Sequence, residues 1–306
     1  NEMGDLSKTA DHQAPLTSTQ FKFSKDVLHE HMLETARVFK TGNKGYARWM
    51  LNSTLGVCMS CHTQLPSVSK SFMDLKSSQS FTSKFDRGEF LFATRDFDRA
   101  AETYTAIVKN YPKEHLTTPQ LEVSLERLLA YYARIKRQPD VAIKKLQALN
   151  ENKSLPQYMK DNLAAWIALM REWSKKPDPI VATATDDIVK NYAEKNLKPQ
   201  LWDKMVKADN PRLVTHLRVS GFLYEYLNTH PNTQIMPEIL YWLALCDRGT
   251  SNSFFYSLAT MYLKECITHY STSPVAKKCF REYEEYTVSS FSGSSGTHLP
   301  DDVTRE

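Results

Sequence analysis

Hydrophobic side chains recur along most of this chain at intervals of three and four residues, which is the period of one face of an α-helix. In the N-terminal part this pattern predicts two helices, over about residues 25–40 and 45–63, separated by the glycine stop Thr41-Gly42-Asn43. The two helices would form an antiparallel hairpin that ends before Pro66. The predicted apolar stripe of its first helix consists of Leu28, Met32, Thr35, Ala36 and Phe39.

The same period returns after residue 83 and continues almost to the C-terminus, interrupted by prolines and other turn residues. The helices predicted there lie near residues 84–95, 97–111, 119–137, 139–150, 156–174, 180–196, 199–207, 211–230, 235–247, 253–270 and 274–288. The chain is therefore predicted to be all-α. Its parts are a flexible arm (1–23), a helix hairpin (24–66), a serine-rich linker (67–83), a domain of helix pairs (84–290) and a flexible tail (291–306).

Composition agrees with a helical protein and narrows its function only slightly. Glycine is scarce, with nine residues in 306, and charged residues make up 24% of the chain, with a net charge of +4. The basic residues are spread along the chain as solvated helix surface, so no nucleic-acid partner is predicted. No apolar run approaches the length of a membrane span, so none is predicted. Hydrolase triads, phosphate-binding glycine loops and zinc-ligand spacings are absent from the sequence, which makes an enzyme the less favoured class.

Five consecutive residues carry the most specific chemistry of the sequence: Cys58-Met59-Ser60-Cys61-His62. On a helix, residues three and four apart share a face, so both thiols and the imidazole point the same way. Two thiols in this register can add to the two vinyl groups of one porphyrin, and the imidazole can then ligate its iron. With five Cys and nine His in 306 residues, chance predicts roughly 0.002 matches to the pattern. The alternatives are a redox dithiol and half of a zinc site, which would need two more ligands.

C-x-x-C-H is the haem attachment signal of c-type cytochromes, which the chain resembles at this motif. Residues 24–65 are similar to half of the four-helix cytochromes of the c-prime type. The resemblance implies one covalent haem c, with Cys58 and Cys61 as thioethers and His62 as the proximal iron ligand. It also implies export to the periplasm, because such haem is attached outside the bacterial cytoplasm. Two helices of that fold are missing, so either the rest of the chain or a homodimer through the hairpin must complete the pocket.

The sixth ligand of the iron is left open by the sequence. In a hairpin that turns near Gly42, His62 lies opposite the start of the first helix, where His29 and Met32 are within reach. His29 is the distal candidate and Met32 the alternative, while a surface histidine and a core methionine are the plainer interpretations. His31 is expected to point elsewhere on the helix. An open sixth position, as in the c-prime proteins, is the third alternative.

A second resemblance, to the tetratricopeptide repeat, begins after the linker. The residues that match the repeat in type and spacing are Gly88, Ala100, Tyr104 and Pro112. Lys84 and Arg87 stand where the repeat usually has Trp and Leu, as in an atypical terminal copy. Fainter copies are suggested by Ala130, Ala142 and Leu146, and by Tyr226–Pro231 with Ile239–Cys246. The resemblance implies an α-solenoid over residues 84–290, whose extended surface would bind a protein partner; a plain helical bundle is the alternative.

Three cysteines lie outside the motif: Cys246, Cys266 and Cys279. Cys266 near the end of one predicted helix and Cys279 near the start of the next would come close in an antiparallel pair. In an oxidising compartment they could form a disulfide, and otherwise both are small buried hydrophobic residues.

Together these features predict a periplasmic monohaem c-type cytochrome whose helical repeats dock a protein partner, most simply for one-electron transfer. The alternative is a haem-based gas or redox sensor, or an envelope assembly scaffold with a non-catalytic haem.

Overall fold

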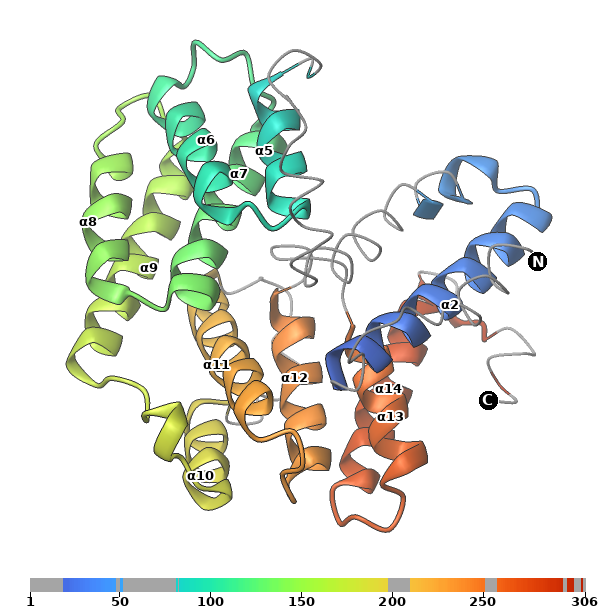
Figure 1. The fold of residues 1–306 in the computed structure, drawn as a ribbon. Helices are drawn as coiled ribbons and strands as arrows, with labels where there is room; N and C mark the ends of the chain where they lie inside the picture. The colour runs from blue at the N-terminus through green and yellow to red at the C-terminus, as the bar shows by residue number, and fades with distance from the viewer. Residues whose placement is uncertain are drawn as a thin grey trace.

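The computed structural model describes residues 19–47, 50–51, 81, 83–197, 210–250, 258–293, 296–299 and 304 (Figure 1). The described part is almost entirely helical, which confirms the predicted all-α class. The helices of its first half are α2 (Thr19–Lys40), α5 (Lys84–Ala93), α6 (Phe97–Asn110), α7 (Thr118–Ala130), η2 (Tyr131–Lys136), α8 (Pro139–Asn150) and α9 (Gln157–Lys175). Those of its second half are η3 (Val181–Thr183), α10 (Asp186–Asn196), α11 (Asn210–Thr229), α12 (Met236–Thr250), α13 (Ala259–His269) and α14 (Ala276–Ser290).

The helix ends follow the turn chemistry of the sequence. The Ser83 side chain accepts a hydrogen bond from the backbone N–H of Asp86 at the start of α5. At the start of α7, Thr117 and Gln120 form a reciprocal capping box. Pro139 occupies the first position of α8, where a missing N–H costs nothing. Capping and proline placement therefore explain why most predicted helix bounds agree with the structure to within a few residues.

Several predicted segments differ from the structure or lie outside its description. The helix expected from residue 25 begins already at Thr19, within the arm predicted over 1–23. The helix expected over 119–137 ends as a π-helical segment, η2. Arg137, which directly follows η2, has a left-handed conformation (φ 51°) and caps this segment. The helix expected over 180–196 begins only at Asp186, where Thr185 caps it. The helix expected at 199–207 lies outside the described residues. In the tail, Ser292–Gly293 (β1) and Gly296–Thr297 (β2) pair as a two-stranded antiparallel ladder.

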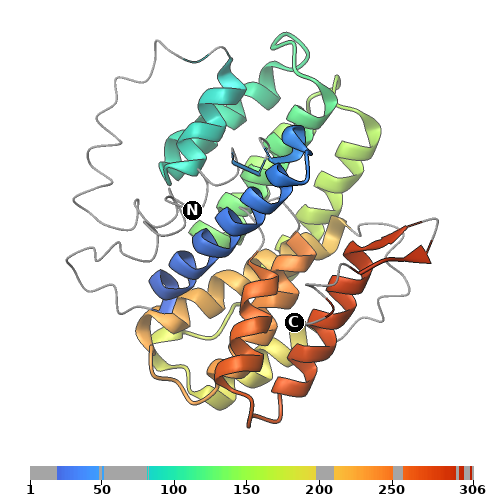
Figure 2. The same cartoon turned by 90° about the vertical axis from the view of Figure 1, so that its right-hand side faces the viewer.

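Two hydrophobic cores fill the helical domain, and α11 belongs to both. The first core is formed by α5–α9 together with Leu213, Val214 and Leu217 from the N-terminal half of α11. The second is formed by α10 and α12–α14 together with Val219, Phe222 and Leu223 further along α11. Figures 1 and 2 show consecutive helices lying side by side along an arc, with α11 between the two groups.

The backbone of α11 approaches that of η2 closely at Gly221. A Cβ atom at this position would lie 2.6 Å from the carbonyl oxygen of Arg134. Only a residue without a side chain allows this approach, because the obstructing atom belongs to the backbone and cannot rotate away. Gly221 therefore sets the distance between α11 and η2.

A buried carboxylate ties the same region together. Asp178, whose side chain is 6% exposed, accepts hydrogen bonds from Arg137, Arg218 and the hydroxyl of Tyr192, each at 2.6–2.7 Å. The Arg218 guanidinium also lies 4.9 Å from the centre of the Trp173 ring. One side chain in the α9–α10 connection thus joins η2, α10 and α11, and its charge is balanced by two guanidinium groups.

Replacing Gly221 by alanine is expected to destabilise the protein by about 1–3 kcal/mol, because the added methyl group must displace backbone. Helix propensity alone would predict a gain of up to about 1 kcal/mol, so the sign distinguishes the two effects. Urea unfolding followed by circular dichroism measures the change. Gly45→Ala is the matched control, because its Cβ would meet nothing within 4 Å. A Gly221→Ala protein as stable as the control would contradict the close approach.

The buried ring of His216 on α11 predicts a dependence of stability on pH. Burial, together with the nearby Arg212, lowers the pKa of His216 from 6.5 to about 4. Between these values the unfolded chain binds a proton that the folded protein does not. The free energy of unfolding should therefore fall by up to about 3 kcal/mol as the pH decreases from 6.5 to 4. Denaturant unfolding at several pH values should show a smaller decrease in His216→Gln, and an unaltered one in His298→Gln, whose side chain is exposed.

Candidate cofactor site

The three residues of the predicted haem attachment motif, Cys58, Cys61 and His62, lie outside the described residues. Of the second helix predicted over 45–63, residues 45–47 and 50–51 are described, and all of them are helical. The structural information on the candidate site therefore comes from α2, the turn that follows it and the first residues of the next helix.

The turn after α2 forms as its sequence predicts. Gly42 adopts a left-handed conformation (φ 89°), and the N–H of Thr41 donates to the carbonyl oxygen of Arg37. The Asn43 side chain then accepts a hydrogen bond from the backbone N–H of Tyr46. Val38 of α2 packs with Ala47 and Met50 in a small hydrophobic cluster of its own. The chain thus reverses at Gly42, and the two helical segments contact one another.

His31 makes a polar contact between the described parts of this hairpin. Its Nε2 donates a hydrogen bond of 2.7 Å to the carbonyl oxygen of Met50, and the side chain is only 4% exposed. Thr35, one turn further along α2, is also buried and donates to the carbonyl oxygen of His31. His31 is thus a structural residue that joins α2 to the following helix.

The buried face of α2 differs from the predicted stripe. The buried residues are His31, Met32, Thr35 and Val38, whereas Phe39, predicted to be apolar core, is 57% exposed. From its position on the helix, His31 is expected to point away from the face that carries His29 and Met32. The carbonyl group of Met50 reverses that expectation, because it gives the buried imidazole a partner.

Both predicted distal ligands lie on α2, one turn apart. Met32 is 7% exposed and His29 is half-buried. Imidazole and thioether are both axial ligands of haem iron in c-type cytochromes, so the donor atoms on this helix suit such a group. His62 lies outside the described residues, so no distance decides between His29 and Met32. The assignment of the sixth ligand stays a prediction.

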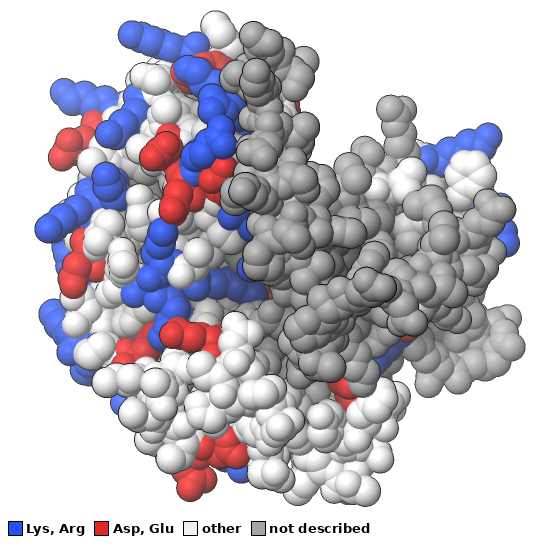
Figure 3. All heavy atoms as spheres, in the orientation of Figure 1, with Lys and Arg blue, Asp and Glu red and all other residues white. Residues whose placement is uncertain are grey.

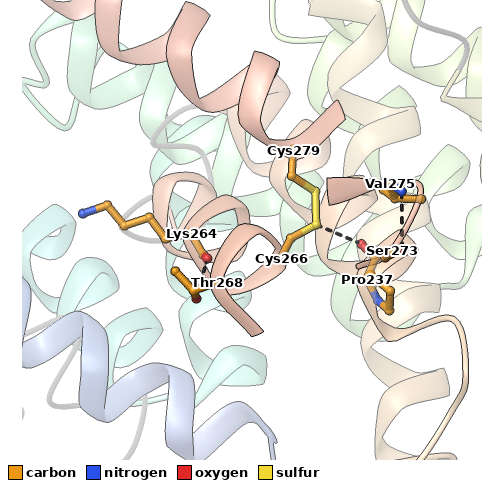
Figure 4. Close-up of a disulfide and its surroundings, with 7 residues drawn as sticks. All are labelled: Pro237, Lys264, Cys266, Thr268, Ser273, Val275 and Cys279. Carbon is orange, nitrogen blue, oxygen red and sulfur yellow. Dashed lines mark hydrogen bonds between the residues drawn. A yellow bond between two sulfur atoms is a disulfide. The ribbon is translucent and has the colours of Figure 1, made fainter. Parts of the chain in front are cut away.

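Cys266 of α13 and Cys279 of α14 form a disulfide with a Cα–Cα distance of 6.3 Å (Figure 4). Of the two alternatives that the sequence left open, the structure has the disulfide. Cys246 is a free, fully buried thiol among the described cysteines. Burial raises the pKa of the Cys246 thiol far above its usual value, which keeps it protonated and unreactive.

One cluster of polar side chains in the helical domain is engaged in structural contacts. Tyr104 donates a 2.5 Å hydrogen bond to Glu89, which also accepts from Arg127, and the guanidinium of Arg127 lies over the Phe92 ring. Burial and the adjacent Glu89 carboxylate raise the pKa of Tyr104. No spacing in the sequence indicates this cluster, because its members come from three different helices. Within the described part, no three His, Cys, Asp or Glu side chains are grouped so that they could hold a metal ion.

Charged side chains of both signs are interspersed on the face of the helical domain shown in Figure 3. This distribution agrees with the small net charge of the chain. Among the helices of the described part, none combines the length and the apolar composition that a membrane span requires.

Comparison with known proteins gives no relative of this chain. No protein-family model, no curated protein and no solved structure matches it. Its function must therefore be inferred from its own residues.

Replacing His31 by alanine is expected to loosen the hairpin, because the buried carbonyl oxygen of Met50 loses its donor at a cost of about 1–3 kcal/mol. Hydrogen exchange of amides in residues 28–51 measures local opening and should become faster in the variant. Lys40→Ala, at an exposed position of the same helix, is the control. Equal exchange rates in the two variants would show that the His31 contact does not hold the hairpin.

Proposed function

We propose that this protein is a periplasmic monohaem c-type cytochrome, in which a short helix hairpin carries the haem and a domain of helix pairs docks a protein partner for one-electron transfer. The observation that carries the proposal is the motif Cys58-Met59-Ser60-Cys61-His62, whose residue types and spacing match covalent haem attachment. The chain reverses at Gly42, between α2 and the helical residues that lead toward the motif, and this supports placing the motif in a helix hairpin.

The residues that would hold the group are Cys58 and Cys61, through thioether bonds, and His62, through the proximal bond to iron. When bound, the haem would supply reversible one-electron oxidation and reduction of its iron. The protein side of the site would be built by α2, where His31 fixes the hairpin through the carbonyl oxygen of Met50. His29 and Met32 are the candidates for the sixth ligand, and either would favour electron transfer over the binding of a gas.

The interpretation of residues 84–290 as tetratricopeptide-like repeats is supported by the packing of the first pair, α5 and α6. A Cβ atom on Gly88 would lie 2.7 Å from the Tyr104 ring, so the small residue and the aromatic residue of the repeat pattern face one another. Ala100 of the same pattern is completely buried. The fainter copies are also buried at their key positions, Ala142 and Leu146. A row of such pairs would give the extended surface that the proposed partner needs.

The location in the periplasm is supported by the disulfide between Cys266 and Cys279. Disulfides persist in oxidising compartments and are rare in the reducing cytosol. The compartment in which c-type haem is attached is thus also the one in which this pair of thiols would be oxidised.

Absorption spectra of the natively matured protein, with a pyridine haemochrome, test the proposal. A c-type spectrum with sharp low-spin bands in the reduced state is expected, because a protein side chain would occupy the sixth position. Cys58→Ala together with Cys61→Ala should abolish covalent haem, and Cys246→Ala should retain it. Replacing His29 or Met32 by alanine should convert the spectrum to high spin in the variant that loses the sixth ligand.

Two results would change the proposal. A high-spin spectrum of the unaltered protein would indicate an open position and replace electron transfer by gas or redox sensing. Absence of haem in protein from a host that matures cytochromes would refute the cofactor altogether.

A further inference from the structure

The N-terminal hairpin meets the C-terminal end of the helical domain. Figure 1 shows α2 crossing near the pair α13–α14. Lys264 of α13 donates from its Nζ to the carboxylate of Glu30 at 3.3 Å, across 234 residues of sequence. The lysine side chain is 26% exposed and the glutamate 62%, so water reaches this ion pair only in part.

Both helices of the C-terminal pair hold the Lys264 side chain. Its backbone belongs to α13, and its Nζ lies 5.7 Å from the centre of the Tyr283 ring on α14. An ammonium group over an aromatic ring is attracted to its negative face, so the ring helps to fix the direction of the lysine. Lys264 thus reaches Glu30 from a position that depends on how α13 and α14 pack together.

The disulfide fixes that packing. Cys266 lies two residues after Lys264 on α13 and is bonded to Cys279 on α14. Figure 4 shows the Lys264 side chain extending away from the disulfide, so the bond secures the helix pair from one side while the lysine contacts α2 on the other. The covalent bond and the ion pair therefore act on opposite sides of the same short helix.

On α2, Glu30 lies between the two candidates for the sixth ligand of the haem iron. His29 precedes it directly, and Met32 follows two residues later. A contact that fixes Glu30 in place limits how far α2 can rotate or slide. The positions of both candidate ligands depend on the same restraint.

We propose that the disulfide-bonded pair α13–α14 is the surface that holds the N-terminal hairpin within the same chain, and that Lys264 is its positioning residue. The element that covers the hairpin is then the chain's own C-terminal helix pair, in place of a second copy. The effect on haem chemistry rests on the proposed function, whereas the docking itself does not.

Zero-length cross-linking with a carbodiimide tests the docking directly. Contact between the Lys264 ammonium and the Glu30 carboxylate should give an amide between these residues, detected by mass spectrometry of the peptides. A mixture of ¹⁴N- and ¹⁵N-labelled protein should give cross-linked peptides of one isotope only. Mixed-isotope peptides would show that the contact is made between copies, and their appearance would overturn the proposal in favour of a homodimer.

The pair Lys84–Glu114, at 2.6 Å on the far part of the helical domain, provides an internal control in the same sample. Replacing Cys266 and Cys279 by serine should reduce the Lys264–Glu30 cross-link severalfold and leave the Lys84–Glu114 cross-link unchanged. Loss of both cross-links would mean that the variant is unfolded. In that case the variant Lys264→Gln tests the docking. It should raise the hydrogen-exchange rates of α2 amides about threefold, as expected for loss of a partly exposed ion pair. Unchanged exchange in that variant would refute the docking role.

The haem reduction potential separates positioning from a simple charge effect. Lys264→Gln removes a positive charge and Glu30→Gln a negative one, so electrostatics alone would shift the potential in opposite directions. Loss of a shared contact should shift it in the same direction in both variants, and Lys264→Arg should restore it. Opposite shifts would refute the positioning role. If the protein binds no haem, the proposed function fails, and the cross-link and exchange results still decide the docking.

Discussion

The close approach of α11 to η2 at Gly221 is the constraint on which the helical domain depends. A single helix supplies apolar residues to both cores, so its position affects the packing of each. The carbonyl oxygen of Arg134 lies only 2.6 Å from the position that a Cβ atom on residue 221 would occupy. Asp178 stabilises the same region, because it accepts hydrogen bonds from Arg137, which directly follows η2, and from Arg218 of α11.

A helix shared between two cores distinguishes this domain from a regular repeat array. In such an array each unit contacts mainly its neighbours, and stability is roughly a sum over units. Here neither core is complete without α11, so the two halves should unfold as one cooperative unit. The rigid domain that results can hold a small accessory element, such as the N-terminal hairpin, whose own apolar cluster contains only Val38, Ala47 and Met50.

Much of the fold could be predicted from the sequence because helix positions depend on local signals. The period of apolar residues located the helices, and prolines such as Pro139 marked their ends. The π-helical end of the 119–137 segment carried no such signal, since α11 approaches it from far along the chain. The Asp178 cluster escaped prediction for the same reason. Its arginines and tyrosine come from different elements, and their spacing in the sequence has no meaning until the chain is folded.

The candidate site shows the same division between local and non-local information. The motif Cys58–His62 is complete within five residues, so its chemistry can be inferred without a structure. The role of His31 could not be inferred, because it depends on a carbonyl group of the neighbouring helix. The disulfide lies between these cases. A helix–turn–helix prediction brought Cys266 and Cys279 near one another, but packing was needed to decide that they bond.

The contact between Glu30 and Lys264 also has a consequence for the order of events during biosynthesis. The two residues are separated by 234 positions, which a ribosome working at about 5–20 residues per second covers in roughly 12–47 s. During this interval α2 has been synthesised, but α13, which carries Lys264, has not. The helix α2 is thus synthesised well before the helix that carries Lys264, and this ion pair can form only after the C-terminal helices have been made.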